Sequence, residues 1–221
     1  RNRCSVDFPE YLGKKEMSNI EEDLSELCSK AKEYGAARVS VLPASEVVMD
    51  LRVRLKCLVP VCPNYGVNLM CPPRVMNPDE FSKILAKYNH TIVIQFPICN
   101  DPEKVQEFMD GRSLELLRAE SAYPRTIKKS IVDFMELICK LERDSVKMGY
   151  RFSAGLSGGP CELCDRCVGQ KTGAPCKNPL KARPSMEALG IDVFKTAENA
   201  GMPLDGLNGK DAYWTGLLLV E

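Results

Sequence analysis

Two long stretches of the chain repeat their apolar residues at the spacing of an amphipathic helix. Residues 20–34 and 124–148 both place an apolar side chain at every third or fourth position, and a glycine follows each stretch. Asn77 followed by Pro78 is typical of a helix start, because asparagine caps free backbone N–H groups and proline suits the first helical turn. A further short helix is expected within residues 190–201.

Shorter apolar runs between these helices predict strands. The clearest are ARVSVLP (37–43), TIVIQFP (91–97), YRFSAGL (150–156) and AYWTGLLLV (212–220). The run TIVIQFP is apolar at consecutive positions, which is typical of a strand that helices bury on both faces. We expect ASEVVMDLRVRLKC (44–57) to form a further helix or a helix-like approach to the first cysteines. The alternation of strands and helices predicts an α/β or α+β fold, with a single mixed sheet flanked by helices.

The length and composition of the chain fit one globular domain. Its 221 residues contain neither an internal repeat nor a convincing linker, so we expect a single domain, 1–221, with a cysteine-rich lobe formed by segments 52–74 and 155–184. Its 30 basic residues balance 30 acidic ones, so charge gives no argument for binding nucleic acid or an anionic membrane. No apolar run approaches the length of a membrane span and no export signal is visible, so we expect a cytoplasmic protein.

Cysteine is the residue type that sets this chain apart. Eleven cysteines in a protein expected in the reducing cytoplasm favour metal binding over disulfides. The single histidine, His90, lies at an expected helix–strand junction, where we expect no catalytic role. Zinc sites that mix cysteine and histidine are therefore nearly excluded.

Four cysteines form a group in the C-terminal half of the chain. Cys161, Cys164 and Cys167 have the spacing C-x2-C-x2-C, close to the bacterial ferredoxin pattern, in which a loop wraps one face of an iron–sulfur cubane. Cys176, nine residues after Cys167, is the nearest supply of a fourth thiolate. The alternative is a four-cysteine zinc site, although such sites usually pair two short cysteine turns across a longer spacer.

An earlier group contains Cys57, Cys62 and Cys71. Pro63 and Pro72 directly follow two of these cysteines and stiffen the loop that carries them. The sequence therefore predicts a loop that converges thiols. The alternative is that these are three buried cysteines beside turns.

Both cysteine segments carry positive charge in a chain with no net charge. Segment 52–74 has four basic residues and no acidic one, and segment 155–184 has five basic residues against two acidic ones, so its net charge is +3. Nearby cations stabilise thiolates and the negatively charged clusters that they ligate. This distribution favours the metal interpretation over a chance clustering of solvated lysines.

The order and spacing of the cysteines resemble a known family. The motif C-x4-C-P-N-Y-G-x4-C-P-P is followed by C-x2-C-x2-C-x8-C-K-x-P and then by KARPSMEALGIDV. This combination, which extends from about Val53 to the C-terminal GLLLV, resembles an uncharacterised family of predicted metal-binding proteins of anaerobic bacteria and archaea. The resemblance implies an anaerobic setting and no particular reaction. It implies that the metal ligands are Cys57, Cys62, Cys71, Cys161, Cys164, Cys167 and Cys176.

Three functions remain open from the sequence. The preferred one is an electron-transfer or redox accessory protein that holds one or two [4Fe–4S] clusters and works with a redox partner protein. A second is a non-redox module in which zinc or a cluster simply pins the C-terminal lobe. Many flavin sites leave no short motif, so a flavin also stays open. The turn GLSGGP lacks the spacing of a phosphate loop, and we interpret its glycines as room for the chain to approach a cluster.

The third function is an enzyme with an open iron site. If only Cys57, Cys62 and Cys71 ligate a cubane, one iron can act on a small anionic substrate, whereas Cys4 or Cys99 would close the shell. Basic residues could orient the anion, and other polar residues could supply hydrogen bonds or protons. The basic residues are Arg54, Lys56, Arg74, Lys181 and Arg183, and the others are Tyr65, Asn68 and Glu187.

Overall fold

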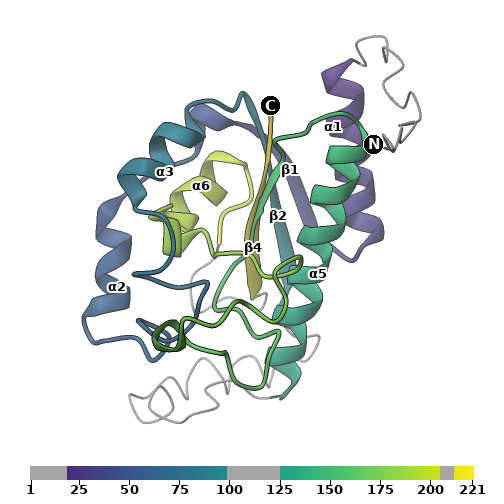
Figure 1. The fold of residues 1–221 in the computed structure, drawn as a ribbon. Coiled ribbons are helices and arrows are strands. Elements are labelled where there is room, and N and C mark those ends of the chain that lie inside the picture. The colour runs from purple at the N-terminus through teal and green to yellow at the C-terminus, as the bar shows by residue number, and fades with distance from the viewer. Residues whose placement is uncertain (1–18, 99–124, 205–211) are drawn as a thin grey trace, which may run out of the picture.

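The computed structural model describes residues 19–98, 125–204 and 212–221, which form one sheet with helices on both sides (Figure 1). The strands are β1 (Arg38–Pro43), β2 (His90–Pro97), β3 (Ala154–Leu156) and β4 (Tyr213–Val220). Their order across the sheet is β1-β2-β4-β3, and each pair of neighbours is antiparallel. The α+β interpretation is confirmed. The described strand pairs are all antiparallel where a mixed sheet was expected, because burial on both faces does not reveal strand direction.

Two long helices cover one side of the sheet. They are α1 (Ile20–Glu33) and α5 (Arg125–Lys147), at the right of Figure 1. Side chains such as Leu27 of α1 and Phe134 of α5 are buried in one cluster with Ile92 of β2. The helices predicted from apolar spacing are therefore present. Of the helices in the described ranges, none combines the length and the apolar character that crossing a bilayer requires.

Three shorter helices lie on the other side of the sheet. These are α2 (Leu55–Leu58), α3 (Pro78–Leu85) and α6 (Val193–Asn199), at the left of Figure 1. A second buried cluster includes Val93 of β2, so this strand is buried on both faces as predicted. Asn77 caps α3, because its side-chain oxygen accepts a backbone N–H at 2.9 Å.

The segment before Cys57 is not one continuous helix. It forms two 3-10 turns, η1 (Ala44–Glu46) and η2 (Leu51–Arg54), followed by α2. Between the turns the chain is extended, and the carboxylate of Asp50 accepts the backbone N–H two residues later at 2.8 Å. Such a side-chain bond competes with the helical path. Of the two expectations for residues 44–57, the helix-like approach is correct.

The glycine-rich turn GLSGGP connects β3 to the second group of cysteines. A Cβ atom on Gly158 would lie 2.6 Å from the carbonyl oxygen of Thr215, and one on Gly159 would lie 2.9 Å from the ring of Trp214. The turn therefore needs glycine because it runs tightly along β4. The space beside these glycines is filled by β4. This corrects the interpretation that the glycines make room for the chain to approach a cluster.

Candidate metal centre

The seven cysteines predicted as ligands lie on two loops. We call residues 57–73 the first loop and residues 161–178 the second loop. All seven have free thiols, as do the other two described cysteines, Cys28 and Cys139. The thiol of Cys139 donates to the carbonyl oxygen of Lys181 at 3.1 Å, and Cys28 packs against the core, so neither belongs to the loops.

Backbone hydrogen bonds fold the first loop back on itself. The N–H of Cys62 donates to the carbonyl oxygen of Cys57 at 3.1 Å. Gly66 has a φ of 69°, which glycine adopts without strain, and its N–H donates to the carbonyl oxygen of Pro72 at 2.8 Å. These turns make the segment that carries Cys57, Cys62 and Cys71 one compact loop.

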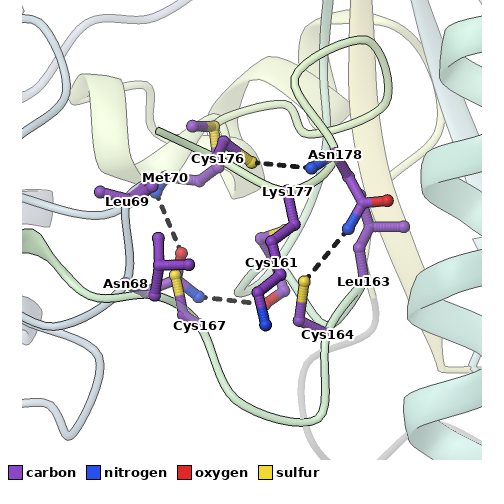
Figure 2. Close-up of a pocket in the computed structure, with 11 residues that line it drawn as sticks. Asn68, Leu69, Met70, Cys161, Leu163, Cys164, Cys167, Cys176, Lys177 and Asn178 are labelled. Carbon is purple, nitrogen blue, oxygen red and sulfur yellow. Dashed lines mark hydrogen bonds between the residues drawn. The ribbon is translucent and has the colours of Figure 1, made fainter. Parts of the chain in front are cut away.

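The second loop places its four cysteines around one cavity. Cys161, Cys164, Cys167 and Cys176 all line it, together with residues 68–70 of the first loop (Figure 2). The cavity thus brings together the whole group predicted from the sequence, including Cys176, whose assignment rested on proximity along the chain.

Asn178 donates hydrogen bonds to two of these sulfurs. Its side-chain Nδ2 lies 3.1 Å from the Sγ of Cys164, and its backbone N lies 3.3 Å from the Sγ of Cys176 (Figure 2). Asn178 therefore contacts and orients two predicted ligands at once.

Two amide side chains join the loops to each other. Asn68, which is buried, donates from Nδ2 to the carbonyl oxygen of Cys161 at 3.0 Å. Gln170 lies in the 3-10 turn η4 (Gln170–Thr172) and donates from Nε2 to the carbonyl oxygens of Asn68 at 2.7 Å and Cys71 at 3.0 Å. The two loops are thus joined by direct hydrogen bonds. Asn68 was predicted as a source of hydrogen bonds, and in the structure its side chain bonds the second loop.

The electrostatics of the thiols also show that the groups are neighbours. Burial raises the pKa of Cys71, and the thiols of both loops, including Cys62 and Cys161, raise it further. Burial likewise raises the pKa of Cys161 to about 11, against the opposing effect of a backbone hydrogen bond from Leu163. Buried thiols of this kind stay protonated near neutral pH until a metal displaces the protons.

A buried carboxyl group lies beside the first loop. Glu187 begins the 3-10 turn η5 (Glu187–Leu189), and its Oε2 atom is buried without a hydrogen-bond partner among the described residues. Burial raises the pKa of Glu187, and its own backbone N–H, neighbouring polar groups and the charge of Lys56 act against this shift. The charge of Glu187 in turn contributes to the raised pKa of Cys57.

The basic residues near the first loop have protein contacts of their own. Arg54 donates to the carbonyl oxygen of Ala188 at 2.8 Å, and the Nζ of Lys56 lies 5.9 Å from the centre of the Phe194 ring. Tyr65 and Arg74 lie within and just after the first loop.

The basic residues after the second loop pair with α5. Lys181 bonds Glu136 at 2.7 Å, and Arg183 forms a two-pronged pair with Glu142, at 2.9 Å from Nε and 2.6 Å from Nη2. Glu142 also accepts the N–H of Gly155 at 2.6 Å. The last two contacts tie the segments just before and just after the second loop to α5, which gives Arg183 a structural role in this fold.

Three residues that matter here were missed from the sequence. Gln170 and Glu142 carry no local signal, because each acts on a segment distant in the chain. The only signal for Asn178 is its place between Cys176 and Pro179 in the motif C-K-x-P.

Cys4 and Cys99, predicted as further ligands, lie outside the described residues. Within the described ranges, no three cysteine, histidine or acidic side chains converge closely enough for a single metal ion.

Comparison with known proteins identifies a family. Residues 40–220 match the family described as "Predicted metal-binding protein (DUF2284)". The chain belongs to the DUF2284 family. The resemblance inferred from the cysteine spacing is thereby confirmed, and the DUF2284 description includes a metal without naming its kind. No curated protein and no solved structure matches the chain.

The donor types that both loops carry are ones that metal centres use. Thiolates are soft donors that select zinc or iron–sulfur clusters. In the second loop four thiols share one cavity and amide donors already bond two of the sulfurs. The first loop supplies three further free thiols.

Proposed function

We propose that this DUF2284 protein holds two [4Fe–4S] clusters, one on each loop, and acts in electron transfer or as a redox accessory protein. The observation that carries the proposal is the second-loop cavity, where four thiols surround one space and Asn178 donates to two of them. N–H bonds to cluster sulfurs are one of the means by which proteins set a cluster's reduction potential.

The connection between the loops supports a pair of clusters. Asn68 and Gln170 tie the loops together, and thiols of both loops influence the pKa of Cys71. Bound clusters would supply one-electron redox chemistry. The hydrogen bonds between the loops support this pairing, because transfer between two centres needs them to be held close together.

We further propose an acidic redox protein as the partner. Segment 52–74 carries four basic residues and no acidic one. Leu51, Leu55 and Val59, next to Cys57, are each more than half exposed. An apolar surface with basic neighbours favours a partner with acidic residues around its own centre, and such binding weakens as salt is added. We place this activity in a reducing cell interior, where the thiols stay available for a cluster.

Anaerobic purification tests the proposal. We expect about four iron and four sulfide ions for each cluster, hence about eight of each per chain, and visible absorption that bleaches on reduction. The double substitution Cys164→Ser with Cys167→Ser should remove half of the iron, whereas Cys139→Ser should retain it all. Stoichiometric zinc without sulfide would overturn the proposal in favour of a structural zinc protein.

A second candidate function is an enzyme with a substrate-accessible iron on the first loop. The observation that favours it is that the first loop supplies three thiols, with Arg54 and Lys56 nearby. A small anion should then perturb the electron paramagnetic resonance of the reduced first cluster. A spectrum indifferent to anions would leave electron transfer as the function.

A further inference from the structure

The turn between the first two cysteines holds apolar side chains in the solvent. Leu58, Val59 and Val61 lie between Cys57 and Cys62, and their exposed fractions are 42%, 73% and 68%. The two cysteines are themselves only partly exposed. The outer surface of this turn is therefore formed by apolar side chains rather than by thiols.

Backbone contacts hold the turn in one shape. The N–H of Val59 donates to the carbonyl oxygen of Leu55 at 2.7 Å, and Leu58 and Val61 form an antiparallel β-bridge. A surface that is ordered in advance loses less conformational freedom when a partner binds. The exposed side chains of this turn are thus arranged for contact before any partner arrives.

The exposed apolar surface continues onto two helices. Leu55 of α2 is 56% exposed and Phe194 of α6 is 50% exposed, and both helices lie on the same side of the sheet in Figure 1. The Nζ of Lys56 lies 5.9 Å from the centre of the Phe194 ring, so α2 and α6 meet at this surface. Exposed apolar side chains that lie together commonly mark an interaction site. The name apolar face is used below for Leu55, Leu58, Val59, Val61 and Phe194.

The second loop has no comparable surface. Its two large apolar side chains, Leu163 and Val168, are only partly exposed. Its acidic residues Glu162 and Asp165 both face Lys128 of α5, at 3.9 Å and 3.2 Å. Apolar contact with a partner is therefore available at the first loop and not at the second.

Charge decides between a second copy of the chain and a different protein. Arg54 bonds a carbonyl oxygen and Lys56 lies over an aromatic ring, so neither contact is with an acid. In a two-fold symmetric pair the same surface meets itself, so the basic residues of segment 52–74 would face their own copies. An acidic partner is attracted instead. The few side chains of the apolar face also suit transient redox complexes, which bury less than about 1,200 Å² in total.

We propose that a small acidic iron–sulfur carrier protein docks on the apolar face and exchanges one electron with the centre of the first loop. The inference rests on the proposed function, because it requires clusters on both loops, and it deepens that function by locating where electrons enter and leave. When the carrier is the donor, its reduced cluster loses one electron and the first-loop cluster gains it. The second-loop cluster exchanges electrons with the first-loop cluster and does not meet the carrier.

A small acidic ferredoxin is the probe that tests this docking. Val59→Ser with Val61→Ser removes the two most exposed side chains of the apolar face and keeps every cysteine. We expect the dissociation constant, measured by calorimetry, to rise about tenfold. The second-order rate of electron transfer from the reduced ferredoxin, measured by stopped flow, should fall by a similar factor. Binding to the wild-type protein should weaken as salt is added.

A matched pair of valines serves as the control. Val41 of β1 and Val146 of α5 are 41% and 44% exposed, so Val41→Ser with Val146→Ser should leave affinity and rate unchanged. Far-UV circular dichroism and iron content identify folded, loaded variants, and Leu55→Ser decides if the double variant at the turn fails either check. Equal affinity in the wild type and in the loaded variant of the apolar face would overturn the inference, as would a wild type that does not bind the ferredoxin.

The other occupants of the apolar face are outcomes of the same test. The wild-type protein alone should sediment as a monomer, and a dimer that Val59→Ser with Val61→Ser dissociates would assign the face to a second copy. Binding to vesicles of phosphatidylserine and phosphatidylcholine that the same variant abolishes would assign it to a membrane surface. Either result would overturn the inference.

The point of electron entry has a test of its own. Cys164→Ser with Cys167→Ser removes two predicted ligands of the second loop and leaves the first loop intact. This variant should accept an electron from the reduced ferredoxin at the wild-type rate. Loss of that transfer would place the exchange at the second loop and overturn the inference.

The failure of this inference is distinguishable from the failure of the proposed function. If the wild-type protein contains iron and sulfide but binds the ferredoxin no better than the variant of the apolar face, the inference fails and the proposed function stands. If the wild-type protein contains no sulfide, the proposed function falls and the electron exchange falls with it.

Discussion

Asn178 offers the sharpest test at the scale of single residues, because its backbone and side-chain N–H groups donate to two sulfurs of the same cavity. Asn178→Leu removes the bond to Cys164 and retains the backbone bond to Cys176. A hydrogen bond to a charged group contributes about 1.5–3 kcal/mol, and it favours the more negative, reduced cluster. We expect the equilibrium constant for one-electron reduction to fall about tenfold, a shift of about 59 mV toward negative potential.

A redox titration followed by electron paramagnetic resonance measures this shift. Asn199→Leu is the control, because Asn199 lies on α6 and donates to the carbonyl oxygen of Glu46 in η1, apart from both loops. An unchanged potential in Asn178→Leu, or an equal shift in the control, would contradict the role of Asn178.

Tyr34 gives a prediction that depends on pH. Its hydroxyl donates to Asp144 at 2.5 Å, and this bond raises the pKa of Tyr34 above its ordinary value of 10.0. Only the protonated phenol donates, so the stabilisation is complete below the ordinary pKa and is lost as the pH rises through the raised one. Tyr34→Phe should lower the free energy of unfolding by about 1 kcal/mol at neutral pH.

Urea unfolding of both proteins measures the difference. The gap between wild type and Tyr34→Phe should narrow once the pH exceeds about 10. A gap that stays constant from neutral to strongly alkaline pH would show that the phenol proton does not carry the effect.

At this scale the sequence predicts the grouping of the cysteines better than it predicts the contacts around them. The spacing of Cys161, Cys164 and Cys167 is local, so it can be read directly from the chain. The contacts of Gln170 and Glu142 join segments distant in sequence, and no spacing rule reveals them. Lys181 and Arg183 are basic in sequence, but their charges pair with α5 in the fold.

At the scale of elements, the clamp between α5 and the second loop decides how firmly that loop is held. Glu142 accepts from Gly155 before the loop and from Arg183 after it, and the side chains of the pair are each 19% exposed. Removing one partner of a fully buried ion pair typically costs about 3–5 kcal/mol. Because this pair is partly exposed, we expect Glu142→Gln to cost about 2 kcal/mol.

Glu136→Gln is the matched control for the clamp. It breaks the pair with Lys181 on the same helix, where both side chains are more than a third exposed, so the cost should stay below about 1 kcal/mol. Chemical denaturation measures both variants. Equal losses of stability would mean that the clamp is no more than a surface ion pair.

The elements themselves divide into those that apolar spacing could predict and those that it could not. α1, α5 and β2 are set by apolar side chains that face the two buried clusters, so their periodicity is informative. The break between η1 and η2 follows from the side-chain bond of Asp50, which apolar spacing does not register. Strand direction could not be predicted from the sequence either, because the antiparallel register depends on pairing between distant segments.

At the scale of the whole molecule, the two buried clusters that hold the layers together are distinct from the loops that carry the thiols. Neither of the two buried clusters contains a predicted metal ligand. The cysteine loops are instead held by hydrogen bonds of Asn68, Gln170 and Glu142. A metal that binds only the folded loops stabilises them by mass action and leaves the packing of the layers unchanged.

Removal of the metal should therefore loosen the two cysteine loops and leave the packed helices and sheet unchanged. After anaerobic chelation, we expect far-UV circular dichroism to retain the helical signal of α1 and α5, with a cooperative unfolding transition. Hydrogen exchange should accelerate in the first and second loops, where backbone bonds such as Cys62 to Cys57 lose the support of the metal. Peptides from β2 and β4, which are buried between the layers, should exchange as slowly as before. Loss of the helical signal on chelation would show instead that the metal is part of the core's own stability, and that the two layers cannot fold without it.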